Sequence, residues 1–202
     1  MQVPTPSLAD RIGACRLCAA DFAATATAHE PRPVAWFRPG ARLLVAGQAP
    51  GARVHASGRP FTDASGARLR DWLGLGEEAF YDRSRVAVVP MAFCFPGYDA
   101  SGSDLPPPPR CARTWRSEVM ETLGDLRLRV LVGGAAQRWH LGAAAAHGVG
   151  ATVARWRDFA PGVFALPHPS WRNTGWLKRN PWFASELLPA LRARVAEVLA
   201  DG

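Results

Sequence analysis

Four short runs of apolar residues stand out along the chain because apolar and polar positions do not alternate within them. They lie at 41–46 (ARLLVA), 85–89 (RVAVV), 129–132 (RVLV) and 162–166 (GVFAL), and a glycine or a proline follows each run. Such runs are typical of strands that are buried on both faces, as in a parallel sheet. We therefore predict four strands at these positions.

Segments with apolar residues at helical spacing lie between and after these runs. The clearest are 65–75, 112–126 and 187–199. Strands that alternate with helices predict an α/β layered fold with right-handed crossovers. Functional loops in such sheets lie beyond the carboxyl ends of the strands. We therefore expect the functional site in the loops at 47–63, 90–111 and 167–180.

The composition fits a single globular domain over residues 1–202. Hydrophobic residues make up 48% of the chain and charged residues 20%, which is ordinary for a globular protein. No apolar run approaches the roughly 18–20 residues of a membrane span. The first residues lack the basic and apolar regions of a secretory signal. We expect a cytoplasmic protein with no membrane partner.

The charge is strongly positive and almost entirely due to arginine. Lysine and arginine total 24 against 17 acidic residues, which gives a formal net charge of +7, and Lys178 is the only lysine. A GC-rich coding sequence would produce this excess, and so would a surface that binds nucleic acid, because the guanidinium fork matches phosphate geometry. Composition leaves both explanations open.

Four cysteines occur as two pairs. Cys15 and Cys18 form a C-x2-C pair, and Cys94 and Cys111 form a second pair further along the chain. Structural disulfides are rare inside cells, whereas two pairs of thiolates can complete a four-thiolate metal site. The spacing alone suits a zinc ion and an iron–sulfur cluster equally well, and unbound cysteines are a third possibility. Metal binding is the interpretation that we favour.

The loop at 47–63 carries candidate binding groups. Its glycines and proline allow a tight turn in which the backbone N–H groups of Gln48 and Ala49 face a ligand. Phe61 is presented by a second turn and fits either a core position or a stacking platform. Asp63 precedes a predicted helix, so it is a candidate both for catalysis and for the helix N-cap.

The loop at 167–180 (PHPSWRNTGWLKRN) combines aromatic, polar and basic residues. His168 lies between two prolines, which restrict the backbone and orient the imidazole. Ser170 and Asn173 can bond a phosphate or a base edge. Aromatic faces mixed with positive charge are typical of proteins that wedge or stack against DNA. The residues concerned are Trp171, Arg172, Lys178 and Arg179.

Five motifs in this order resemble the uracil-DNA glycosylase superfamily, particularly its iron–sulfur classes, families four and five. They are the C-x2-C pair, GQAPG, SGRPFTDASG, the second cysteine pair and HPSWRN. The resemblance covers nearly the whole chain and implies a three-layer α/β sandwich with a central four-stranded parallel sheet flanked by helices. It also implies a [4Fe-4S] cluster whose ligands are Cys15, Cys18, Cys94 and Cys111.

The resemblance also implies roles for the loop residues. The amides of Gln48 and Ala49 match those that contact the uracil carbonyls, and Phe61 matches the aromatic residue that stacks on the flipped base. His168 matches the histidine that stabilises the departing uracil anion at O2. Asp63 resembles the acid of the family-five pattern, although this sequence is one residue shorter there.

Other positions bear on DNA contact and base choice. Trp171 and Arg172 lie where the family inserts into the duplex, and Arg53 and Arg59 also fall in a loop expected to face DNA. The family-four asparagine that recognises uracil after the second strand is replaced around 90–91. We expect base discrimination to come from backbone groups or from Asn173.

These features predict a monofunctional, monomeric glycosylase that flips uracil from single- or double-stranded DNA and hydrolyses its N-glycosidic bond. A lyase step needs a catalytic lysine, and the setting of Lys178 beside Arg179 suits backbone contact instead. Two alternatives stay open. One is a glycosylase for hypoxanthine or xanthine, and the other is a damage-binding protein that captures DNA covalently, with His55 as the candidate nucleophile.

Overall fold

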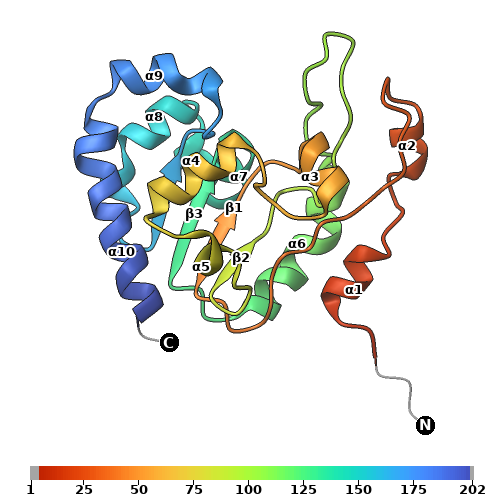
Figure 1. Ribbon diagram of the computed structural model, residues 1–202, viewed down its shortest axis with the longest axis horizontal. Helices are drawn as coiled ribbons and strands as arrows, with labels where there is room; N and C mark the ends of the chain where they lie inside the picture. The colour runs from red at the N-terminus through yellow and green to blue at the C-terminus, as the bar shows by residue number, and fades with distance from the viewer. Residues whose placement is uncertain (1–4, 201–202) are drawn as a thin grey trace.

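The computed structural model describes residues 5–200, which form a central sheet with helices packed on both faces (Figure 1). The strands are β1 (Leu43–Ala46), β2 (Val86–Val88), β3 (Leu128–Val132) and β4 (Val163–Leu166). They lie in the order β2-β1-β3-β4, and every pairing is parallel. Both the four predicted strands and the three-layer α/β fold are confirmed.

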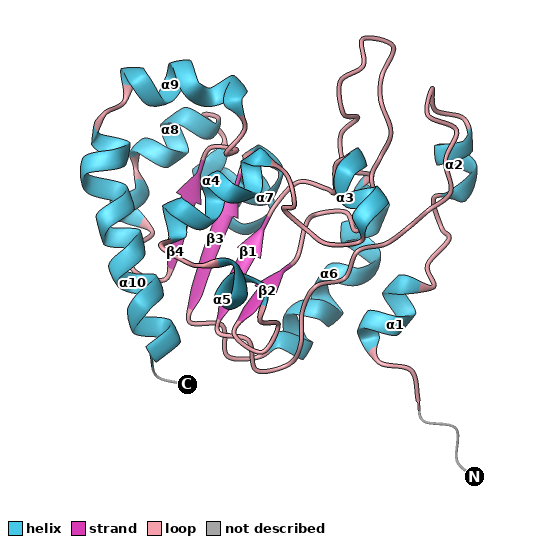
Figure 2. Ribbon diagram, in the orientation of Figure 1, coloured by secondary structure: helices cyan, strands magenta, loops and turns pink. Residues whose placement is uncertain are grey.

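Helices fill the connections and flank the sheet (Figure 2). A π-helical turn, Phe183–Leu187, leads into the last of them. In the described part of the chain they are α1 (Leu8–Gly13), α2 (Ala19–Ala23), α3 (Ala52–Ser57), α4 (Ala64–Leu73), α5 (Glu77–Tyr81), α6 (Pro109–Leu123), α7 (Gly134–Leu141), α8 (Val149–Ala154), α9 (Thr174–Arg179) and α10 (Leu188–Ala200).

Successive residues of a strand belong alternately to two hydrophobic cores, one on each face of the sheet. Leu43 and Val45 of β1 belong to the core that contains Trp72 of α4 and Leu191 of α10. Their neighbours Leu44 and Ala46 belong to the opposite core, which includes residues of α1, α6 and α7. All four residues of β1 are fully buried. Burial on both faces explains why the strands show no polar alternation in the sequence.

The three predicted helices are present, with shifted ends. The segment predicted at 112–126 is α6, which begins and ends three residues earlier. Pro109 stands in its first turn, where a missing N–H costs no hydrogen bond. Gly124, with φ +65°, ends the helix. The shorter helices have too few turns for an apolar repeat to identify them.

A buried cation supports the loop that follows β2. Arg116 of α6 is only 2% exposed, and its Nη1 donates to the carbonyls of Val89 (2.9 Å) and Pro90 (3.2 Å). Its Nη2 contacts Nε2 of His140. Because a guanidinium can only donate, His140 accepts there and is neutral. Burial lowers the pKa of His140 to about 3.

The loops after β1 and β2 are bonded to each other where these strands end. Met91 N–H donates to the Gly47 carbonyl at 2.9 Å, and Ala92 N–H donates to the Gln48 carbonyl at 3.1 Å. The carboxyl ends of parallel strands share one edge, so the loop after β4 opens at the same place. This edge carries the candidate site.

Candidate active site

A cavity of about 280 Å³ lies at this edge of the sheet. Its lining includes five of the residues predicted to act on substrate: Gln48, Ala49, Phe61, Asp63 and His168. They come from the loops after β1 and β4, more than a hundred residues apart in sequence. The fold therefore brings the predicted catalytic and base-binding groups together in one concave site.

The GQAPG turn presents free backbone donors to this cavity. The carbonyl groups of Gly47 and Gln48 accept hydrogen bonds from the loop after β2, which fixes the turn. Within the described chain, the N–H groups of Gln48 and Ala49 donate to no other residue. Two fixed, unused amide donors can bind the carbonyl oxygens of a base without reorganisation.

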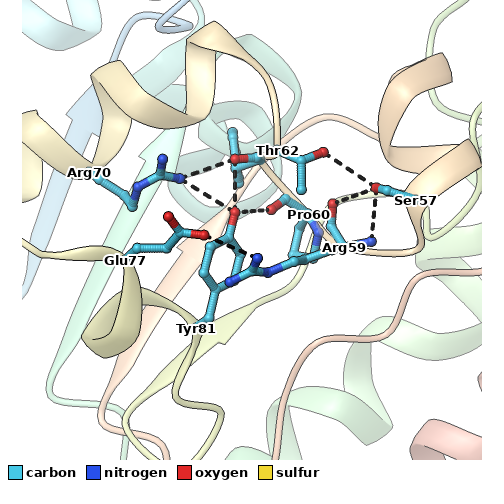
Figure 3. A network of polar contacts seen from close by, with 8 residues as sticks. Ser57, Arg59, Pro60, Thr62, Arg70, Glu77 and Tyr81 are labelled. Atoms are coloured by element: carbon cyan, nitrogen blue, oxygen red, sulfur yellow. Dashed lines mark hydrogen bonds and ion pairs between the residues drawn. The ribbon is translucent and has the colours of Figure 1, made fainter.

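Phe61 has a backbone conformation that side-chain-bearing residues rarely adopt. Its φ is +53°, which costs on the order of 1–2 kcal/mol for an L-residue. The Tyr81 hydroxyl lies 2.9 Å from the carbonyl oxygens of both Pro60 and Phe61, and Arg70 Nη1 donates to the Phe61 oxygen at 3.2 Å (Figure 3). These contacts from α4 and α5 hold the turn that presents the ring.

The Phe61 turn also depends on a glycine in α4. A Cβ built on Gly66 would lie 1.8 Å from the Phe61 carbonyl oxygen. On the other side, the Phe61 ring reaches the GQAPG turn, where a Cβ on Gly47 would lie 3.7 Å from Cζ. The ring therefore lies directly against the loop that carries the amide donors.

Asp63 both lines the cavity and caps a helix. Its Oδ1 accepts from the Gly66 N–H at 3.1 Å and from the Ser65 hydroxyl at 2.6 Å, at the N-terminus of α4. The two interpretations of Asp63 from the sequence are therefore compatible. The cap occupies one carboxylate oxygen, and the described chain gives Oδ2 no hydrogen-bond partner.

The imidazole of His168 is held in one neutral form. The Ser170 N–H donates to His168 Nδ1 at 3.2 Å, so the proton of the neutral ring is on Nε2. Desolvation by the surrounding walls lowers the pKa of His168, although Asp63 and Asp104 oppose the shift. At neutral pH this side chain therefore offers an uncharged N–H donor to the cavity.

The comparison with known families agrees with this geometry. A model of the uracil DNA glycosylase superfamily matches residues 34–192, which is most of the chain. The chain belongs to the uracil DNA glycosylase superfamily. Membership makes it a DNA glycosylase by class, with DNA as its substrate, and it agrees with the parallel four-stranded fold. Cys15 and Cys18 lie before the matched segment.

A superfamily member needs a surface for DNA, and exposed basic and aromatic residues occur in the segment that follows His168. Trp171 is 76% exposed, an unusual position for an indole, and the Arg172 guanidinium lies 5.9 Å from its ring centroid. Lys178 and Arg179 are exposed in the last turn of α9. Their contacts with DNA stay a prediction. Arg59 instead packs 3.6 Å from the Tyr81 ring centroid and pairs with Glu77.

Asn173 and Ser170 brace the histidine loop. The Asn173 side-chain amide donates to the His168 carbonyl at 2.7 Å, and Arg68 of α4 donates to the Ser170 carbonyl at 3.1 Å. Neither Asn173 nor Ser170 is among the described residues that line the cavity. Their predicted contacts with base and phosphate stay predictions, and the structure adds a supporting role.

The sequence analysis missed two residues of the cavity wall. Tyr98 and Asp104 line it from the long loop between β2 and α6, where they face each other in an antiparallel bridge. Pro90 from the same loop lines the cavity too. In the sequence this loop was marked only by its place after a predicted strand, which does not identify an individual acid.

The four cysteines surround a second, small cavity on the side of α1, α2 and α6. Cys15, Cys18, Cys94 and Cys111 all line it, and none forms a disulfide. No three of the described His, Cys, Asp or Glu side chains converge on a single metal ion. Burial raises the pKa of Cys94 to about 12 and that of Cys111 to about 11.

His55 lies outside the cavity among aromatic rings. Its ring packs edge-on against His29 with 5.2 Å between centroids, and its Nδ1 is buried without a hydrogen-bond partner. Burial lowers the pKa of His55. It is not among the described residues that line the cavity. Finally, no helix over residues 5–200 is long and apolar enough to cross a membrane.

Proposed function

We propose that this DNA glycosylase excises uracil and leaves an intact strand with an abasic site. The observation that supports this most is the shared cavity, in which the amides of Gln48 and Ala49, the Phe61 ring, Asp63 and His168 line one space. These are the groups that flipping and hydrolysing a pyrimidine nucleotide requires: donors for its carbonyls, a stacking face, an acid and a neutral donor.

Each group has a task in breaking the bond. The transition state carries positive charge on the sugar and negative charge on the base. The Asp63 carboxylate stabilises the sugar cation, while Nε2–H of His168 and the two amides stabilise the base anion. Trp171 and Arg172 offset the cost of unstacking, which is a few kcal/mol.

A purine base, hypoxanthine or xanthine, is the second candidate substrate, and Pro90 in the cavity wall favours it. Where family four has an asparagine that recognises uracil, the cavity wall here has a proline, which lacks a side-chain donor or acceptor. A wall without that recognition group tolerates hypoxanthine or xanthine better. Covalent capture has no such support, because the candidate nucleophile His55 packs against His29 instead.

We also propose that the cysteines hold a [4Fe-4S] cluster. The donor set fits: all four thiols surround one cavity with largely apolar walls, and Phe93 N–H donates to Cys111 Sγ at 3.4 Å, which favours a thiolate there. A lone zinc ion needs four sulfurs about 2.3 Å from one point. A bound cluster would tie the N-terminal segment and the β2–α6 loop together.

A cleavage assay with the purified protein tests the proposed glycosylase activity. Oligonucleotides with a single uracil, hypoxanthine or xanthine, single- or double-stranded, are incubated with purified protein and resolved on a denaturing gel before and after alkali. We expect breakage at uracil after alkali only. No abasic product from any uracil substrate would contradict the proposed function, and breakage without alkali would contradict the absence of a lyase step.

The colour of the same preparation tests the cluster. We expect a brown protein with visible absorbance and about four irons per chain, bleached by Cys94→Ala and retained in the matched control His168→Ala. A colourless protein that contains zinc would contradict the cluster.

A further inference from the structure

The loop between β2 and α6 brings an acid to the cavity that no motif identified. Asp104 lines the same space as Asp63 and His168. It lies in a hairpin closed by Leu105 N–H to the Gly97 carbonyl and Asp99 N–H to the Ser103 carbonyl, both at 2.9 Å. The position of this carboxylate is therefore set by backbone pairing and is not that of a loose loop.

The N-terminal segment also holds the base of this hairpin in place. Gly97 has φ +95°, and a Cβ there would lie 2.9 Å from the hydroxyl oxygens of both Thr25 and Thr27. The N-terminal segment therefore packs closely against the base of the hairpin. A hairpin fixed at its base can present Asp104 to the cavity without a large ordering cost on binding.

The carboxylate of Asp104 is free for chemistry. In residues 5–200 it makes no hydrogen bond or ion pair, whereas Oδ1 of Asp63 is engaged at the N-terminus of α4. Asp99 of the same hairpin is likewise occupied, because it accepts from Ser101 and Ser103. A general base must have an unoccupied oxygen aimed at its substrate.

We propose that Asp104 is the proton acceptor for the attacking water, an assignment that rests on the proposed glycosylase function. The water oxygen bonds to C1′ of the deoxyribose as the C1′–N1 bond breaks. The electron pair of that bond stays on N1 of the base, which His168 and the amides stabilise. One water proton passes to the Asp104 carboxylate and then to solvent.

The surroundings of Asp104 suit this task. Partial desolvation raises the pKa of its carboxyl, against the opposing effect of Arg172 and His168. Arg53 of α3 and Asp63 also line the cavity, and Tyr98 faces Asp104 across the hairpin. A base whose pKa moves toward neutrality accepts a proton more readily while staying ionised at pH 7.

Single-turnover rates on a uracil oligonucleotide between pH 4 and pH 9 test the proposal. Asp104→Asn should lower the rate at pH 7 by about 10²- to 10⁴-fold. In the wild type the rate should fall with acid as Asp104 is protonated, and this acid limb should be shallower in the variant, where Asp63 is the carboxylate that remains in the cavity. Asp104→Glu should retain the limb. Binding of an uncleavable 2′-fluoro analogue should stay within about threefold of wild type in all variants.

The matched control is Asp99→Asn, the same substitution in the same hairpin, whose amide oxygen can still accept from Ser101 and Ser103. It should keep the wild-type rate and profile. Three results would overturn the assignment while leaving the glycosylase intact: an Asp104→Asn protein that cleaves at a near-normal rate, one that keeps the full wild-type acid limb, or an Asp99→Asn protein that loses as much activity as Asp104→Asn does. A wild type that releases no base would overturn the proposed function and this assignment with it.

Discussion

The carboxylate of Asp63 serves the helix and the cavity at once. Its Oδ1 accepts from the Gly66 N–H at the start of α4, which also donates to the Asp63 carbonyl at 3.0 Å. The same side chain faces the cavity beside His168. A helix N-terminus thereby fixes the orientation of an acid in the site, and one substitution can separate the two roles.

Asp63→Asn should lower excision while preserving the fold. An asparagine Oδ1 can still accept from the Gly66 N–H, so the unfolding temperature should stay near that of the wild type. Loss of the negative charge removes stabilisation of the sugar cation, and we expect a rate at least 10²-fold lower. Gel assays and thermal melts measure the two effects.

The control for this prediction is Asp63→Ala, which removes the cap as well. It should lose activity and also about 1 kcal/mol of stability. If Asp63→Asn cleaves uracil normally, then His168 and other groups carry the chemistry, and Asp63 is a structural cap alone.

Local sequence could identify His168 but not its protonation. The two flanking prolines and the HPS motif mark the residue in the chain. Its tautomer follows from the Ser170 N–H contact, and its neutrality follows from desolvation. The tautomer depends on a contact only two residues along the chain, whereas the desolvation depends on the walls that the fold brings around the ring.

At the scale of elements, α4 and α5 act together to shape one turn. Arg70 of α4 and Tyr81 of α5 both donate to the Phe61 carbonyl. Figure 3 shows the side chains of Arg70 and Tyr81 meeting beside Pro60. Burial raises the pKa of Tyr81, so its hydroxyl stays protonated and able to donate at neutral pH. The GRPF motif places an aromatic ring here, but the supporting residues lie 9 and 20 positions further along the chain.

Tyr81→Phe should weaken substrate binding more than it slows the chemistry. It removes the hydroxyl shared between the Pro60 and Phe61 carbonyls of a strained turn, a loss of about 1 kcal/mol. We therefore expect KM to rise about fivefold with kcat nearly unchanged. Steady-state kinetics on a uracil oligonucleotide measure both constants.

A double-mutant cycle with Phe61→Leu decides whether Tyr81 acts through Phe61. Once the ring is gone, removal of the hydroxyl should add little, so the two effects should not be additive. Additive effects would show that Tyr81 contributes independently of Phe61.

The sequence predicts some elements of the fold and not others. The four strands could be predicted because burial on both faces leaves an unbroken apolar signal, and the longest helices because they repeat an apolar face. Helices of five or six residues, such as α2 and α5, carry no repeat of that kind. The hairpin with Asp104 depends on packing between Gly97 and the N-terminal segment, which neither stretch shows alone.

At the scale of the whole molecule, the buried pair of Arg116 and His140 links α6, α7 and the cavity wall. Arg116 holds the Pro90 carbonyl, and Pro90 lines the cavity. The guanidinium also donates to His140, which accepts as a neutral ring. The stability of the fold therefore depends on pH through this pair.

The protein should lose stability as the pH falls below about 6.5. The pKa of His140 is about 3 in the fold against 6.5 ordinarily. Between these values the unfolded chain binds a proton that the folded chain does not. Stability is thus fully present above pH 6.5 and declines toward pH 3, by about 2 kcal/mol between pH 7 and pH 5. Urea titrations at both pH values measure it.

His140→Gln should flatten this dependence, because glutamine offers Arg116 an acceptor but does not titrate. The lowered pKa values of His55 and His168 leave part of the slope in place. The exposed His147 serves as the control, since His147→Gln should behave as the wild type does. An unchanged slope in His140→Gln would contradict the role of His140.

The strained turn at Phe61 has one more consequence. Because Tyr81 and Arg70 hold it through contacts within the protein, this turn needs no DNA to keep its shape. A cavity that does not collapse on release of the strand still fits the detached base. The free base should therefore compete with damaged DNA, so that turnover slows as product accumulates.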